Sequence, residues 1–180
     1  RRHRPRRAGG GAVTHALGAV ARVAAALTRA SIVVVAALML AALCWQVLVR
    51  YVFASPSIWS EELAVLMFSW TVMGGLALGV REGWHVRLTL LPEALPRGAR
   101  IWAERATDLV TAALGGFLAW SGLRFYDITA GSVSAAIGYP IEVLNAMAPV
   151  AGALMALFGL ERAIRPGGAL PPPPQGDPAA

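Results

Sequence analysis

The residue types that carry most catalytic and metal chemistry are few in this sequence, and they are poorly placed for it. The three histidines, His3, His15 and His85, all lie outside the apolar stretches, whereas haem binding in a bundle needs histidines on facing helices. The sequence also lacks a serine and histidine pair within an apolar stretch, an acidic cluster at metal-ligand spacing and a Gly-rich phosphate loop. We therefore expect no catalytic residue, no metal ligand and no cofactor, and we expect that the chain is not an enzyme.

Carboxylates are the next candidates, because an ion-coupled transporter needs an ionisable group deep inside a membrane span. Six acidic residues border the apolar stretches, and each lies at the end of a stretch: Glu61, Glu62, Asp108, Asp127, Glu142 and Glu161. Side chains in such places can reach water or pair with Arg50 or Arg124. The sequence therefore predicts no ion-coupling site of its own in this chain.

The elements that position these residues are long apolar helices. Hydrophobic residues make up 57% of the 180 and charged residues only 14%, against about 25% charged in a soluble domain. Residues 32–49, 63–80, 109–123 and 143–160 carry no charge, and an eighteen-residue helix of about 27 Å nearly spans the ~30 Å hydrocarbon core. The third stretch extends over 103–126, with interfacial aromatic residues at both ends. This pattern predicts an all-α membrane protein with four transmembrane helices.

The arginines predict the orientation of these helices. All sixteen basic residues are arginine, and fourteen precede the first span, connect the second to the third or follow the fourth. The two exceptions, Arg50 and Arg124, lie in the other two loops. Because positive residues stay on the cytoplasmic side, both termini are expected there, in a multi-pass protein of the bacterial inner membrane. The net charge of +6 then comes from arginines that flank the membrane spans. We therefore expect the lipid bilayer, and no nucleic acid, as a partner of this chain.

The ends of the chain differ in composition from its middle. In the segment from Thr14 to Ala30, His15, Arg22 and Arg29 recur every seven residues, which places them on one stripe of a helix. This segment is either an amphipathic helix at the cytoplasmic interface or a long extension of the first span. We expect an Arg-rich arm and amphipathic helix over 1–30, a transmembrane domain over 31–164 and a disordered Pro-rich tail over 165–180. The spans are expected at about 31–50, 60–80, 103–125 and 142–162.

Small residues recur at helical spacing within the spans. Gly75 and Gly79 lie four residues apart in the second span, a spacing that lets helices approach closely in lipid. Similar small faces are offered by two further pairs, Ala112 with Gly116 and Gly152 with Ala156. We expect Gly75 and Gly79 to form a contact, either within the bundle or with a partner chain.

Two further groups of residues are candidate partner contacts. Trp59, Glu61 and Glu62 open the second helix, where the helix dipole also favours carboxylates. They are therefore either a simple helix start at the interface or an outer-surface contact with another subunit. The second group, in the loop after this helix, is either a positively charged cytoplasmic turn or a partner contact; it comprises Arg81, Gly83, His85 and Arg87.

The order and spacing of these elements resemble a known family. The chain reads Arg50-Tyr-Val-Phe53, then Trp59-Ser-Glu61-Glu62-Leu63, Phe68-x-Trp70 and Gly74-Gly75, then Arg81-x-Gly83-x-His85-Val86-Arg87 before a Leu-Pro pair. In a protein with four spans, this series resembles the small membrane subunit of tripartite ATP-independent periplasmic (TRAP) transporters, the DctQ type. The resemblance runs from about Ser31 to Ile164.

The resemblance implies a division of labour among three proteins. A large membrane subunit, the permease, would carry the substrate and sodium sites, and a periplasmic substrate-binding protein would deliver a carboxylate. An ion gradient would supply the energy, and the small subunit would be a scaffold for the large one. The alternative is a self-contained small transporter or channel that forms its path by oligomerisation.

Overall fold

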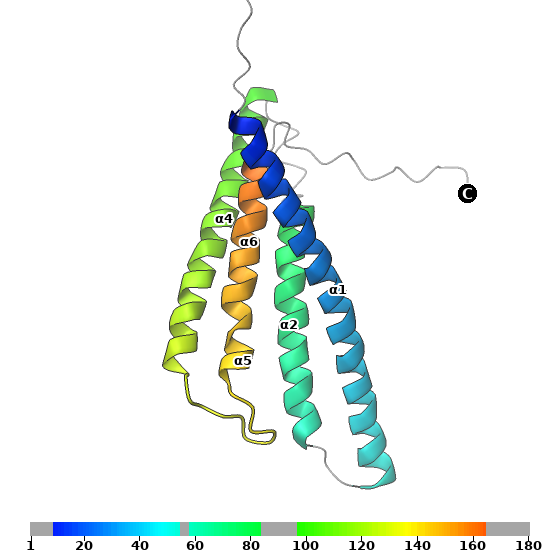
Figure 1. Cartoon of the computed structure of the whole chain (residues 1–180). Coiled ribbons are helices and arrows are strands. Elements are labelled where there is room, and N and C mark those ends of the chain that lie inside the picture. Colours follow the sequence, from blue (N-terminus) through cyan, green and yellow to red (C-terminus); the bar gives the residue numbers. More distant parts are fainter. Residues whose placement is uncertain (1–8, 55–57, 84–96, 165–180) are drawn as a thin grey trace, which may run out of the picture.

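Long helices make up most of the computed structural model, which describes residues 9–54, 58–83 and 97–164 (Figure 1). Four of them are α1 (Gly9–Val52), α2 (Ile58–Glu82), α4 (Arg97–Ile128) and α6 (Met147–Ile164), and a short α5 (Glu142–Asn145) leads into α6. Four helical segments are long and apolar enough to cross a membrane: His15–Val52, Ile58–Glu82, Trp102–Ile128 and Glu142–Ile164. The prediction of four helices able to span a membrane is therefore confirmed.

Helix α1 differs most from the expected boundaries. Its 44 residues form one helix without interruption, about 66 Å long at 1.5 Å per residue. The boundary expected near residue 30 is not a break in the helix, which runs without interruption from Gly9 to Val52; near it, the Thr28 hydroxyl donates to the Ala24 carbonyl and the Ser31 hydroxyl to the Thr28 carbonyl. Residues 14–30 are therefore helical and continuous with the helix of the first span.

The helices pack as two antiparallel pairs, α1 with α2 and α4 with α6. Contacts between α2 and α6, and fewer between α1 and α6, join the pairs. Figure 1 shows the pairs close together where α1 and α4 begin and α2 and α6 end, and spread apart toward the opposite end. We call these the narrow end and the wide end. The apolar core includes Ala21, Ala25, Ala77, Val80 and Phe158, contributed by α1, α2 and α6.

A compact turn closes the wide end between α4 and α5. An isolated antiparallel bridge joins Val133 to Pro140, and the Ser134 amide donates to the Tyr139 carbonyl at 2.9 Å. The Asn145 side chain donates to the Thr129 hydroxyl at 2.7 Å. These bonds satisfy polar groups that would otherwise be exposed at the membrane boundary, and they give the turn a defined shape. We call residues 129–141 the wide-end turn.

Candidate interaction and positioning sites

Close packing through glycine occurs between α4 and α6. A Cβ atom added to Gly115 would lie 2.5 Å from the Ala156 backbone nitrogen, and one added to Gly122 would lie 2.7 Å from the Pro149 nitrogen. On α6, Gly152 faces the backbone of Ala119 in the same way. We call this contact the glycine seam; its members are Ala112, Gly115, Ala119 and Gly122 of α4 and Pro149, Gly152, Ala156 and Gly159 of α6. Such close approach of backbones is a main source of helix association in lipid.

Gly75, Gly79 and Gly116, for which the sequence indicated close contacts, lie outside the glycine seam. Gly75 is exposed, and a Cβ atom added to it would meet nothing within 4 Å; the same holds for Gly116. The neighbour Gly74 instead packs against the Ile32 side chain of α1 at 3.1 Å. Gly79 is half-buried. Within this chain Ala112 packs against Gly159 while Gly116 makes no such contact, and Gly75 likewise faces away from the rest of the chain.

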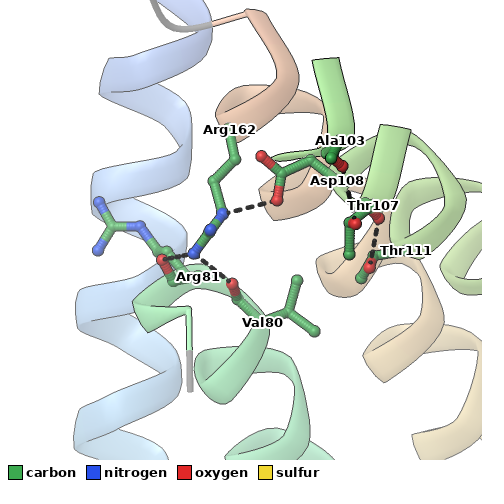
Figure 2. A network of polar contacts seen from close by, with 7 residues as sticks. All are labelled: Val80, Arg81, Ala103, Thr107, Asp108, Thr111 and Arg162. Atoms are coloured by element: carbon green, nitrogen blue, oxygen red, sulfur yellow. Dashed lines mark hydrogen bonds and ion pairs between the residues drawn. The ribbon is translucent and has the colours of Figure 1, made fainter. Parts of the chain in front are cut away.

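Charged side chains are buried together at the narrow end, where Figure 2 shows Arg162 pointing between α2 and α4. The Arg162 Nε donates to Oδ1 of Asp108 at 2.9 Å, and Nη1 donates to the carbonyls of Val80 and Arg81 at 3.3 and 3.4 Å. Asp108 is only 6% exposed. A buried charge is costly unless it is paired and hydrogen-bonded, and this pair meets both conditions.

A second ion pair lies beside the first. Nε of Arg81 is 3.5 Å from Oε2 of Glu161, and its guanidinium lies over the Phe158 ring, 5.8 Å from the ring centre. Glu161 is 3% exposed. The sequence-based expectation that Asp108 and Glu161 reach water or pair with Arg50 or Arg124 is therefore wrong. Arg162 and Arg81 come from the same end of the bundle and are nearer in the fold.

The glycine after α2 is adjacent to this cluster. Gly83 has a positive φ of 75°, the left-handed conformation that commonly ends a helix. Its amide donates to the Val80 carbonyl at 3.3 Å. The structure thus places Arg81 and Gly83 in one site within this chain. The other two members of that group, His85 and Arg87, lie outside the described residues.

At the wide end, Glu62 binds the wide-end turn. Its carboxylate accepts from the Ser134 hydroxyl at 2.7 Å and from the amides of Ala136 and Ile137 at 2.9 and 3.0 Å. Burial raises the pKa of the nearby Tyr139 hydroxyl, and the Glu62 charge raises it further, so this phenol stays neutral at physiological pH. Glu62 therefore connects α2 to the α4–α6 pair at the end where the pairs are farthest apart.

Glu61 and Trp59, which are close to Glu62 in the sequence, do not share its contacts with the wide-end turn. Glu61 accepts one hydrogen bond from the Gln46 side chain of α1 at 3.0 Å, and Trp59 is 46% exposed. The sequence places these three residues at one helix start, and the structure shows that they serve different contacts. Of the three, Trp59 has a large exposed side chain and no hydrogen bond from it to another described residue.

Replacing Glu62 should loosen the wide-end turn. In Glu62→Gln an amide group takes the place of one carboxylate oxygen and meets an N–H donor, so at least one bond to the turn is lost. In a Cys44→Ala background carrying Ile137→Cys, we expect severalfold faster thiol labelling at position 137 with Glu62→Gln than with Glu61→Gln. Equal labelling rates for the two glutamine variants would contradict this role.

A groove lies between the pairs in the wide half of the bundle. It has a volume of about 810 Å³ and is lined mainly by apolar side chains of α2, α5 and α6, among them Leu66, Met67, Trp70, Val143 and Met147. Its carboxylate, Glu142, already accepts a bond from the Gly131 amide. No group of three or more His, Cys, Asp or Glu side chains lies close enough to hold a metal ion in the described part of the chain. The Glu142 Oε2 atom is buried without a hydrogen-bond partner among the described residues, so the groove offers mainly apolar contact and a carboxylate that would repel an anionic solute.

A family model matches most of this chain. It covers residues 39–166 and is described as the DctQ component of tripartite ATP-independent periplasmic transporters. The chain belongs to the DctQ family. All of α2, α4 and α6 lie within the matched residues, together with the narrow-end ion pairs and the glycine seam. The resemblance seen in the sequence is confirmed.

Two relatives of this DctQ-family chain are named as proteins of TRAP transporters. It is 29% identical over 126 residues to the sialic acid TRAP transporter small permease protein SiaQ of Vibrio cholerae, a match that covers 70% of this chain and 73% of the relative. It is 32% identical over 110 residues to the sialic acid TRAP transporter permease protein SiaT of Haemophilus influenzae. That match covers 61% of this chain but only 18% of SiaT. In SiaT a segment like this one is therefore part of a much longer polypeptide.

Sequence reasoning missed two sets of residues. The partners Asp108, Glu161 and Arg162 were visible as charges near span ends, but nothing in the sequence linked them. Of the seam, only Ala112, Gly152 and Ala156 were identified from the sequence, although its small residues on α4 recur at intervals of three and four, at 112, 115, 119 and 122, which is the spacing of one helix face. That signal could have identified the α4 side of the seam.

Proposed function

We propose that this chain is the small, non-catalytic membrane subunit of a TRAP-type secondary transporter and that it is a scaffold for a large permease subunit. The observation that carries the proposal is the match to SiaT, in which a segment similar to this chain makes up a small part of a longer permease. The mainly apolar lining of the groove between the helix pairs agrees with it. The substrate and ion sites would then lie on the large subunit.

The complete system would take up a carboxylate. A periplasmic binding protein would deliver the substrate, and a sodium or other ion gradient would drive uptake. Both termini of this chain would lie in the cytoplasm and its wide end at the outer face of the bacterial inner membrane, as the fourteen-to-two distribution of arginines supports. Sialic acid, named for both relatives, is the first carboxylate to test.

The partner surface would include the exposed residues of α2. Gly75 is open and permits the close approach of another helix, and Trp59 is exposed at the wide end. We include Glu61 and Gly79 in this surface, because both lie on α2 near these two residues. His85 and Arg87 would contact the same subunit on the cytoplasmic side.

Reconstitution tests the proposal. The purified chain alone in liposomes should give no uptake of radiolabelled sialic acid, a dicarboxylate or a keto acid, because the described lining of the groove is mainly apolar and its charged group, Glu142, is itself a carboxylate. A large membrane subunit that co-purifies with the tagged chain, together with the binding protein and a sodium gradient, should give uptake of at least one of them. Ion-driven flux through the small chain alone would overturn the proposal and favour a self-contained oligomeric transporter or channel.

A further inference from the structure

Arg162 contacts three elements at the narrow end. It belongs to α6, its Nε binds Asp108 of α4, and its Nη1 binds the carbonyls of Val80 and Arg81 at the end of α2. The last carbonyls of a helix have no partner within the helix, and a positive charge near them is favourable. One side chain thus satisfies the end of α2 and a buried carboxylate of α4 at the same time.

The residue after α2 leaves space for this side chain. A Cβ atom added to Gly83 would overlap Nη1 of Arg162 and would lie 3.3 Å from both its Cζ and its Nη2. Glycine is therefore favoured at position 83 for two separate reasons, the positive φ and the space that the guanidinium occupies. The second reason is absent at Gly138, which has the same φ of 75° but nothing within 4 Å of an added Cβ.

The charges around Arg162 are balanced and shielded from solvent. Asp108 is 6% and Glu161 3% exposed, and each faces one of two half-buried arginines, Arg162 and Arg81. The α1 backbone covers the cluster, because a Cβ atom added to Gly18 would lie 3.8 Å from Oε1 of Glu161. Removing one member of a buried pair leaves the other charge unpaired, which costs more than removing both.

We propose that Arg162 is the positioning residue of the narrow end and that Gly83 is its obligatory neighbour. By holding the end of α2 against α4 and α6, Arg162 sets the place from which the two helix pairs diverge toward the wide end (Figures 1 and 2). The Arg81-x-Gly83 part of the sequence motif then works within this chain and not at a partner surface. The inference concerns the chain alone and is independent of the proposed function.

Second-site suppression tests whether Gly83 makes room for Arg162. Asparagine accepts positive φ better than other residues with a Cβ atom, so Gly83→Asn mainly adds volume, and Gly138→Asn is the matched control. Lysine in Arg162→Lys keeps a positive charge toward Asp108 but lacks the Nη1 group that lies beside Gly83. The measurement is the thermal unfolding midpoint of the detergent-purified chain, together with its abundance in the membrane.

We expect Gly83→Asn to reduce abundance severalfold and to lower the midpoint, whereas Gly138→Asn leaves both near the wild-type values. In the Arg162→Lys background, adding Gly83→Asn should cause less than half of that loss. An equal loss in both backgrounds, or equal losses for Gly83→Asn and Gly138→Asn, would overturn the proposal.

Neutralising the ion pair provides a second, independent measurement. Arg162→Gln and Asp108→Asn should each lower the midpoint, because each leaves a buried charge without its partner. The double variant should be more stable than Arg162→Gln alone, since glutamine and asparagine can pair without charge. Additive losses in the double variant would show that the two residues act separately, and the positioning role would be rejected.

Discussion

Gly115→Val is expected to destabilise this protein strongly, whereas Gly116→Val, one residue further along α4, is expected to have little effect on it. A Cβ atom on Gly115 would lie 2.5 Å from the backbone nitrogen of Ala156 and 2.9 Å from the carbonyl oxygen of Gly152. Because these are backbone atoms, the α4–α6 pair must separate to admit the side chain. The two substitutions have the same intrinsic helix cost, so their difference measures the seam alone.

The magnitude follows from the way helices associate in lipid. There is little hydrophobic force between helices in a membrane, so close packing supplies much of the association energy. Overpacking a well-packed core costs about 1–3 kcal/mol, and the rigid backbone at Gly115 places this variant at the upper end. Thermal unfolding followed by tryptophan fluorescence in detergent, with membrane abundance beside it, gives the comparison. Equal midpoints for the two valine variants would show that the helices do not meet at the seam.

Gly75→Leu should have the opposite profile: an intact chain that binds its partner poorly. Gly75 is exposed with nothing within 4 Å of an added Cβ, so leucine there meets no atom of this chain. If α2 packs on the large subunit through this glycine, leucine forces the two helices apart. A loss of about 1–3 kcal/mol corresponds to a decrease of fivefold or more in the large subunit recovered with the tagged chain. Gly79→Leu tests the same face one turn further along.

The control for this experiment is Gly116→Leu, an equally open glycine on α4. Membrane abundance should match the wild type for both Gly75→Leu and Gly116→Leu, while recovery of the large subunit should fall for the first. Unchanged recovery with Gly75→Leu would remove Gly75 from the partner surface. Degradation of the Gly75→Leu chain in the absence of the large subunit would mean that α2 packs on this chain in a way the structure does not show.

The sequence alone was sufficient for the number of helices able to span a membrane and for the family. Both depend on properties that are local in the chain: uncharged stretches such as 63–80, and motifs such as Trp59-x-Glu61-Glu62 whose residues are close together. A membrane makes the first signal strong, because a stretch of apolar residues has few other stable environments. Helix α2 and the apolar segment Glu142–Ile164 lie within about two residues of the expected spans 60–80 and 142–162, which follows from the same signal.

The tertiary structure decided which faces of the helices meet. The composition of α4 shows adjacent glycines at 115 and 116, but only the rotation of the helix places Gly115 against α6 and Gly116 away from it. Likewise, Asp108 and Arg162 are 54 residues apart in the chain, and their pairing at 2.9 Å depends on the relative height of α4 and α6. Hydropathy is an average over all faces of a helix and over the length of a span. It therefore does not show which face of one helix turns toward another, or how far the two helices are shifted along their axes. Those two quantities are set by side-chain packing between distant segments, which is why the ion pairs and the contact between the two sides of the glycine seam appeared only in the fold.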